Sequence, residues 1–184
     1  MSVPASPIVR TRLHTREVRI EGYRRSDGLW DIEGRLADVK DHDFEHAAGV
    51  RPAGRPIHDM WLRIAVDEQL KIHEAEACMD GVPFPGTCDE IAPDYSKLAG
   101  LSIGPGFRKQ VSELLGGTLG CTHVTELLWS LATAAYQTLA QHLYSHQDPA
   151  RKPFHLEGCH AWDREGSMVQ QYFPRWYKPR SDAA

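Results

Sequence analysis

LWDIEGRL, residues 29–36, alternates apolar and charged side chains, so that Trp30, Ile32 and Leu36 fall on one side of an extended chain. Residues 17–23 (EVRIEGY) alternate in the same way. Between the two stretches, Ser-Asp-Gly at residues 26–28 is a typical turn signal. These stretches therefore predict an antiparallel hairpin.

Residues 61–77 predict a second hairpin. Leu62, Ile64 and Val66 take every second position at its start, as a half-buried strand requires. The segment between the two hairpins, residues 38–56, contains several Gly and Pro residues and is predicted to be a long loop.

The second half of the chain changes to a helical period. Residues 105–115 and 122–146 predict two helices with apolar faces, and residues 88–98 predict short helical turns. Strands followed by helices indicate an α+β fold. We expect a four-stranded antiparallel sheet built from two hairpins, with the helices packed on one face. From residue 150 onward we expect an irregular C-terminal segment rich in aromatic residues.

Composition excludes several classes of protein. The 184 residues carry 21 Lys and Arg against 25 Asp and Glu, a formal charge of −4, whereas nucleic-acid binders usually show a basic stripe. No apolar run approaches the roughly 20 residues of a membrane span. We therefore expect a cytoplasmic protein that binds a small-molecule substrate, without nucleic acid or membrane, and that can form a homo-oligomer.

The expected domain organisation has three parts. Residues 1–15 lack the apolar stretch of a signal peptide and are read as an N-terminal arm. Residues 16–177 are expected to form a single globular domain, followed by a polar tail over residues 178–184.

His58 and Asp59 stand side by side at the start of the second hairpin, beside the Gly- and Pro-containing loop. A histidine next to a carboxylate can supply a general base, and Glu33 is a further candidate proton carrier. However, adjacent residues of a strand point to opposite faces, so both side chains cannot enter one pocket if the strand has already begun. The alternative is that His58 is a loop histidine and Asp59 caps the turn.

Cysteines provide the second candidate group. Cys121 precedes the long predicted helix, where the helix dipole favours a thiolate, and His123 follows two residues later. Cys88 opens the preceding helical segment. If Cys88 and Cys121 converge with His58 or His123, they form a site suited to zinc; the alternative is that each cysteine is packed separately. The cofactor is therefore zinc or none.

Aromatic side chains are candidates for substrate binding. Trp30, Trp61, Tyr95 and Trp129 could line a pocket and stack on an aromatic or phenolic ligand. The alternative is that these rings fill the core.

Several short stretches carry a resemblance to a known family: residues 28–34 (GLWDIEG), 38–40 (DVK), 58–63 (HDMWLR), 104–106 (GPG), 120–123 (GCTH), 159–161 (CHA) and 172–177 (YFPRWY). On these stretches, which span nearly the whole chain, the sequence resembles family 2889 of the bacterial domains of unknown function. The resemblance implies little assigned chemistry.

A more distant resemblance covers residues 59–135, which are similar to the iron–sulphur cluster scaffold proteins. In this comparison Cys88 and Cys121 match the second and third scaffold cysteines, and His58 lies near the position of the first. The resemblance implies that Cys88, Cys121, His123 and His58 gather at one end of the sheet.

Two classes of function follow. The first is a small-molecule enzyme that uses acid/base chemistry, lyase-like on an aromatic or phenolic compound, for example by carbon–carbon cleavage that releases formaldehyde. His58, Asp59, Glu33 and His123 are its candidate catalytic residues. The alternative is a non-catalytic zinc, iron–sulphur or sulphur carrier related to the cluster scaffolds.

Overall fold

The computed structural model describes residues 6–180, so that parts of the expected arm (residues 1–5) and tail (residues 181–184) lie outside the described residues. The chain divides into two compact units, one ending at Ala140 and the other beginning at Gln141. Each unit is described by itself below.

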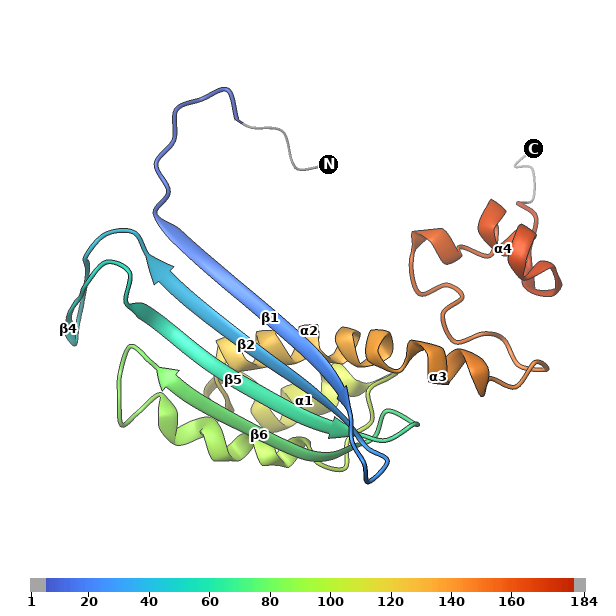
Figure 1. Cartoon of the computed structure of the whole chain (residues 1–184), viewed down its shortest axis with the longest axis horizontal. Helices are drawn as coiled ribbons and strands as arrows, with labels where there is room; N and C mark the ends of the chain where they lie inside the picture. Colours follow the sequence, from blue (N-terminus) through green and yellow to red (C-terminus); the bar gives the residue numbers. More distant parts are fainter. Residues whose placement is uncertain (1–5, 181–184) are drawn as a thin grey trace. The chain divides into compact units, whose positions relative to one another are not determined.

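The first unit is built on a four-stranded antiparallel sheet, as the alternation predicts, and the fold is α+β (Figure 1). Its strands follow one another in the spatial order β1-β2-β5-β6. They comprise β1 (His14–Arg24), β2 (Trp30–Lys40), β5 (Pro56–Val66) and β6 (Ile72–Gly81). Each of the two predicted hairpins therefore contributes a pair of neighbouring strands.

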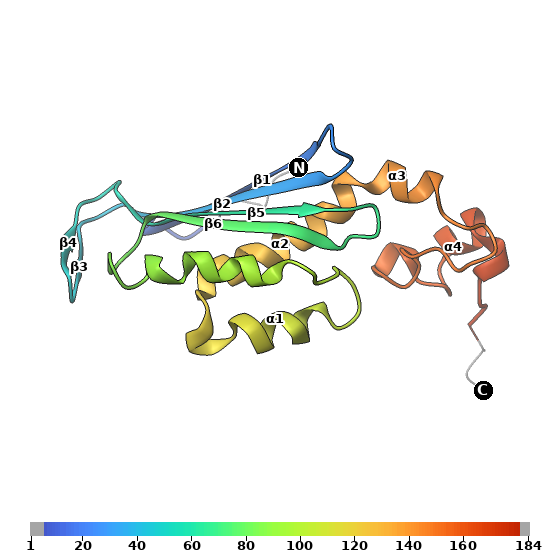
Figure 2. The same ribbon diagram turned by 90° about the horizontal axis from the view of Figure 1, so that it is seen from below.

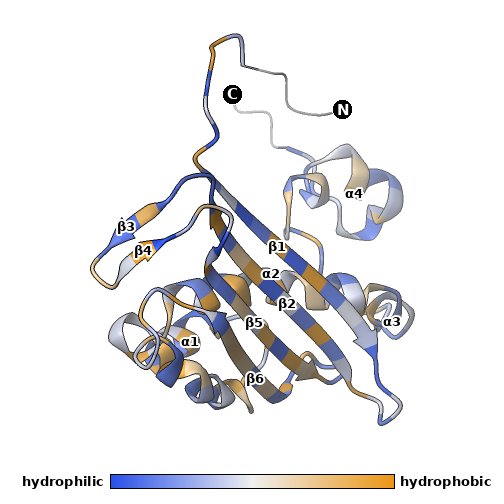
Figure 3. Cartoon of the chain, turned by 60° about the vertical axis from the view of Figure 1, so that its left-hand side comes forward, coloured by the Kyte–Doolittle hydropathy of each residue, from blue (hydrophilic) through white to orange (hydrophobic). Residues whose placement is uncertain are grey.

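One face of the sheet is apolar and the other is polar. Along β2, Ile32, Gly34 and Leu36 are buried, and along β5 the same holds for Leu62 and Ile64. Figure 3 shows the resulting alternation of hydrophilic and hydrophobic positions along the strands. The period of two thus places every second side chain in the core.

The segment between β2 and β5 is more ordered than the expected loop over residues 38–56. It contains a small hairpin of β3 (Phe44–His46) and β4 (Gly49–Arg51), which form a separate two-stranded sheet. Directly after the turn at residues 47–48, β4 begins with Gly49, whose φ of 115° suits glycine. Strands this short leave almost no periodic signal in a sequence, which explains why the hairpin is not predicted.

Helices follow the last strand. They are the 3-10 helix η1 (Asp89–Leu98), α1 (Phe107–Leu115), the 3-10 turn η2 (Gly117–Leu119), α2 (Thr122–Thr138) and α3 (Ala140–Ser145). Figure 2 shows α2 running beneath the sheet, where it contacts β1, β2 and β5, while η1 contacts β6. None of the helices within residues 6–180 is long and apolar enough to cross a membrane.

The predicted helix over residues 122–146 is interrupted at Leu139. The Thr138 hydroxyl donates a hydrogen bond of 2.9 Å to the carbonyl of Ala134, four residues earlier. Such back-bonding by threonine often bends helices, and here it lies directly before the break.

The second unit holds η3 (His160–Trp162), α4 (Ser167–Tyr172) and η4 (Pro174–Trp176). Aromatic rings surround His155, with ring centroids 4.7 Å away for Trp162 and 5.1 Å away for Phe173. Ring packing of this kind supplies a small apolar cluster within the unit.

Candidate active site

Three polar residues on neighbouring strands lie directly opposite one another on the inward face of the sheet. In the register, Arg16 of β1 pairs with Asp38 of β2, and Asp38 pairs with His58 of β5. On β2, Asp38 is in phase with the buried residues Ile32 and Leu36, because successive even-numbered positions point to the same face. Arg16 and His58 lie opposite Asp38 and share this face. The strand pairing therefore places a cation, a carboxylate and an imidazole side by side at one end of the core.

Asp38 is the centre of this group and is only 3% exposed. Its carboxylate accepts two hydrogen bonds of 2.8 Å from the Arg16 guanidinium, one of 2.8 Å from His14 Nε2 and one of 2.9 Å from His58 Nδ1. An ionised carboxylate only accepts, so His58 carries its hydrogen on Nδ1. The Nε2 atom of His58 is left with a free lone pair, as a general base requires.

A local irregularity of β5 aims His58. The register shifts between Asp38 and Val39, because Asp38 pairs with His58 whereas Val39 pairs with Pro56. Ile57 is therefore the extra residue of a β-bulge, a feature that re-aims side chains near functional sites.

The first turn of α2 brings a second histidine to the group. The rings of His58 and His123 lie 3.8 Å apart between centroids, with 31° between their planes. Arg16 also donates a 2.8 Å hydrogen bond to Glu126, one turn further along α2. The bond joins the start of the helix to the edge strand and holds His123 above His58.

Tyr95, which is completely buried in η1, fixes the same end of α2. Its hydroxyl donates to the carbonyl of Cys121 at 2.8 Å and accepts from the backbone N–H of the same residue at 3.0 Å. Both backbone groups of the residue before the helix are thus satisfied by one side chain.

Burial sets the pKa values of the two histidines. It lowers the pKa of His58 below 6.5, against the opposing effect of its bond to Asp38. Burial also lowers the pKa of His123, and the neighbouring His58 adds to this shift. At neutral pH both imidazoles are therefore largely uncharged.

Asp38 remains ionised. Burial by itself would raise its pKa, but the hydrogen bonds from Arg16, His14 and His58 outweigh this effect and hold the pKa well below 3.8. The site thus combines a carboxylate anion with a neutral imidazole, which is the resting state of an oriented general base.

The group opens into a cleft of about 440 Å³. Its wall is formed by β1, β2, the β3–β4 hairpin, β5, the segment after β6 and the start of α2. The lining residues are His14, Arg16, Asp38, Lys40, Phe44, His46, Ile57, His58, Pro83, Phe84 and His123. A cleft of this size fits a small molecule.

The carboxylate and the two histidines can also be compared with a metal site. Within residues 6–180, one group of this kind is Asp38, His58 and His123, whose ligand atoms lie within 4.8 Å of one another. However, both Asp38 oxygens already accept hydrogen bonds, and the Arg16 guanidinium lies against them. A cation next to the carboxylate disfavours a divalent metal ion, so the arrangement fits proton transfer better.

Three of the predicted site residues lie on the opposite face of the sheet. Asp59 accepts two hydrogen bonds of 2.7 Å from Arg35, whose guanidinium also lies 5.4 Å from the ring centroid of Trp61. Glu33 and Trp61 line a separate, smaller cleft of about 210 Å³ on this face. Of the predicted catalytic residues, the structure therefore brings together His58 and His123 and separates them from Asp59 and Glu33.

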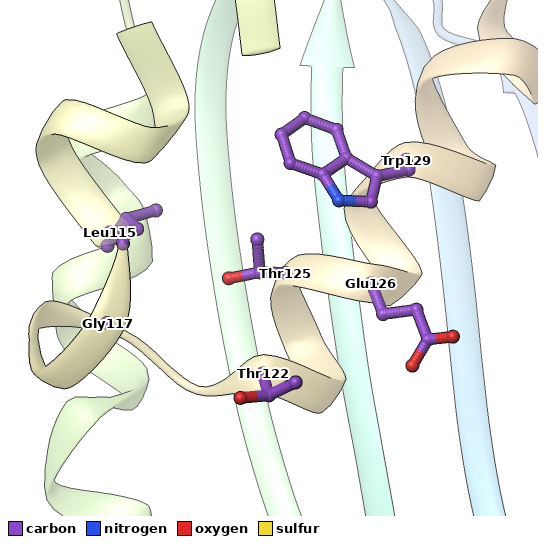
Figure 4. Close-up of a pocket in the computed structure, with 7 residues that line it drawn as sticks. Leu115, Gly117, Thr122, Thr125, Glu126 and Trp129 are labelled. Atoms are coloured by element: carbon purple, nitrogen blue, oxygen red, sulfur yellow. The ribbon is translucent and has the colours of Figure 1, made fainter. Parts of the chain in front are cut away.

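The other predicted aromatic residues also lie outside the cleft of His58. Trp30 begins β2 at the far end of the sheet, and Tyr95 is in the core. Figure 4 shows Trp129 on α2 beside a different pocket, which Thr125 and Glu126 also line. Arg108 lies 4.6 Å from the ring centroid of Trp129.

Cys88 and Cys121 line one further cleft, of about 330 Å³. The sulphur of Cys121 lies 4.0 Å from Nδ1 of His123 and 4.0 Å from the sulphur of Met60. Neither cysteine belongs to the group of ligand atoms around Asp38. Cys121 therefore lies beside His123 and shares a separate cleft with Cys88.

Sequence reasoning missed most of the residues around the histidines. Asp38 occurs in phase with Ile32 and Leu36, and a carboxylate in phase with a buried row is a usable signal for a site. Arg16 is likewise in phase with the apolar positions of β1. Phe44 and Phe84 give no comparable signal, because neither belongs to a long periodic element.

Comparisons with known proteins identify the family of the chain. A search of curated proteins and a search of solved structures found no match. The family described as "Protein of unknown function (DUF2889)" matches residues 14–137, which include all four strands of the sheet and nearly all of α2. This match covers most of the chain and includes Asp38, His58 and His123. The chain therefore belongs to that family of proteins of unknown function.

Proposed function

We propose that the protein is an enzyme that acts on a small molecule by acid/base chemistry, with His58 as the general base. The observation that supports this proposal is the hydrogen bond from His58 Nδ1 to the buried Asp38 carboxylate, which leaves Nε2 free beside a cleft. Asp38 orients the imidazole and stabilises its protonated form. His123 supplies a second imidazole on the same side of the cleft.

The reaction class that suits this pair is carbon–carbon cleavage of the lyase type. In the example of formaldehyde release, His58 Nε2 takes the proton of a hydroxymethyl group, and the C–C bond breaks to give formaldehyde. The electron pair of that bond stays on the remaining carbon, which then takes the proton back from His58. Atoms and charge balance without a redox partner, and His123 is placed to hydrogen-bond the developing negative charge.

Replacing His58 by alanine tests this proposal. We expect formaldehyde release from a panel of hydroxymethyl-bearing aromatic compounds to fall about 10²–10⁴-fold in turnover, because the base is lost. The matched control is His73→Ala, since His73 also bonds a carboxylate, that of Asp67 at 2.7 Å, but on the exposed edge strand β6. Equal turnover in the His58→Ala variant and the control would refute the role of His58.

The pH dependence provides a second test. A base must be uncharged, and burial lowers the pKa of His58 below 6.5. Activity should therefore be full at neutral pH and should fall only as the pH drops below this lowered value. We expect the acidic limb of a kcat/KM profile to lie at lower pH than that of an unperturbed histidine. A limb at or above pH 6.5 would contradict the assignment.

A metal or sulphur carrier is the second candidate function. It is favoured by the ligand atoms of Asp38, His58 and His123 within 4.8 Å of one another, with Cys121 beside them. Elemental analysis of protein purified without a histidine tag separates the two candidates. A stoichiometric metal that is lost in the His123→Ala variant would favour the carrier, whereas protein that turns over without metal would favour the enzyme.

A further inference from the structure

The two permanent cations that line the cleft of His58, Arg16 and Lys40, differ in their partners. The carboxylates of Asp38 and Glu126 both bond Arg16 at 2.8 Å, so the charge of Arg16 is balanced. Neither of these carboxylates bonds Lys40, which is therefore the cation of the lining that is open to an anionic ligand.

Within the described part of the chain, no carboxylate forms an ion pair with Lys40. The nearest acidic residue in sequence, Asp41, is occupied by Arg12, with bonds of 2.6 and 3.1 Å. The ammonium group of Lys40 instead lies 5.5 Å from the ring centroid of Phe44. A half-buried cation over an apolar wall favours an anionic ligand.

Aromatic rings form that wall. Phe44 and His46 of the β3–β4 hairpin stack with centroids 5.7 Å apart, and His46 meets Phe84 edge-on at 5.9 Å. A hydrogen bond of 2.7 Å from Arg51 to the carbonyl of Val82 ties the hairpin to the segment that carries Phe84. Ring surfaces held in this way suit a flat apolar ligand, which can stack or pack edge-to-face.

The distance along β2 relates the cation to the base. Lys40 and Asp38 are two residues apart on the same face of the strand, a spacing of roughly 7 Å. A ligand whose anionic group is held at Lys40 therefore extends about one aromatic ring toward His58, which bonds Asp38.

From these observations we propose that the ligand of the cleft is a small aromatic carboxylate. Its anionic group pairs with Lys40, and its ring lies against Phe44 and Phe84. This proposal takes from the proposed function only that the cleft of His58 is the substrate site. Lys40 is the residue that selects for charge, and His58 is not required for binding.

Calorimetric titration of the full chain near neutral pH tests the ligand class with three probes: benzoate, benzamide and cyclohexanecarboxylate. We expect benzoate to bind about tenfold more tightly than neutral benzamide, and several-fold more tightly than the non-aromatic acid. Equal binding of benzoate and benzamide would overturn the anion site, and equal binding of the two carboxylates would overturn the aromatic assignment.

Lys40→Met should weaken benzoate binding about tenfold, whereas Lys40→Arg, which keeps the charge, should retain it. The matched control is Lys71→Met, because Lys71 is exposed and precedes β6 at the opposite end of the sheet. An unchanged affinity in Lys40→Met, with the fold intact by circular dichroism, would refute the role of Lys40.

The His58→Ala variant keeps the two proposals apart. It should bind benzoate within about threefold of the unmodified chain while its turnover is lost. Binding that depends on Lys40, together with undiminished turnover in His58→Ala, would refute only the catalytic proposal. If His58→Ala loses turnover but Lys40→Met binds benzoate as tightly as the unmodified chain, only the proposal for the ligand is refuted.

Discussion

Asp38→Asn is expected to lower turnover about 10²–10⁴-fold and to destabilise the fold by about 2–3 kcal/mol. The amide of asparagine replaces one of the two accepting oxygens by an NH2 group, so it cannot accept all four bonds. We expect His58 to lose the partner that keeps its hydrogen on Nδ1. This loss of stability is smaller than that expected from breaking a fully buried ion pair. The reason is that the Arg16 side chain is 32% exposed and keeps part of its hydration. Turnover and urea unfolding measure the two effects.

Nitrogen-15 NMR of the histidine ring gives a readout that needs no substrate. In the unmodified chain His58 should carry hydrogen on Nδ1, and in Asp38→Asn it should shift toward the other tautomer. The matched control is Asp41→Asn, whose carboxylate pairs with the exposed Arg12. A control that loses as much turnover as Asp38→Asn would show that the effect is not specific to the buried carboxylate.

Gly34→Ala is expected to lower the free energy of unfolding by about 2 kcal/mol. A Cβ atom at Gly34 would lie 2.3 Å from Cδ1 of Leu131 and 3.0 Å from Cδ1 of Leu127. Both leucines are buried on α2, so neither can move aside without disturbing the contact between the helix and the sheet. Chemical denaturation monitored by circular dichroism measures the change.

A double variant tests the cause of that loss. Leu131→Ala alone leaves a cavity, but it also removes the atom nearest to the new methyl group. We therefore expect the double variant Gly34→Ala, Leu131→Ala to lose less unfolding free energy than the two single variants lose together. The difference should be at least about 1 kcal/mol. Additive changes would show that close approach of the helix is not the reason for glycine at this position.

Much of the sheet could be predicted because one face is buried. The alternation around Ile32 and Leu36 identifies the strand and also its inward side, and Leu62 and Ile64 do the same for β5. The same argument applies to the separation of His58 from Asp59, since neighbouring strand residues point to opposite faces. The break of the long helix at Leu139 could not be predicted from apolar spacing, which continues across it.

The site could be predicted only in part, because its bonds join residues far apart in the sequence. Asp38 lies 20 residues before His58, and they meet through strand pairing beside a bulge at Ile57. The contact between the rings of His58 and His123 depends in addition on where α2 begins over the sheet. Local patterns fix periodicity, whereas such contacts depend on register and on helix placement.

The β3–β4 hairpin separates part of the cleft wall from the strands that carry the proposed base. The proposed proton-transfer groups stand on β2, β5 and α2. Phe44 and His46 of the wall instead stand in the segment between the end of β2 at Lys40 and the start of β5 at Pro56. Residues 41–55 can therefore change in length and sequence without altering the pairing of Asp38 with His58. The part of the proposed ligand preference that depends on Phe44 and His46 can thus change with this short insertion, whereas the part that depends on Lys40 stays on β2 beside the pair of Asp38 and His58.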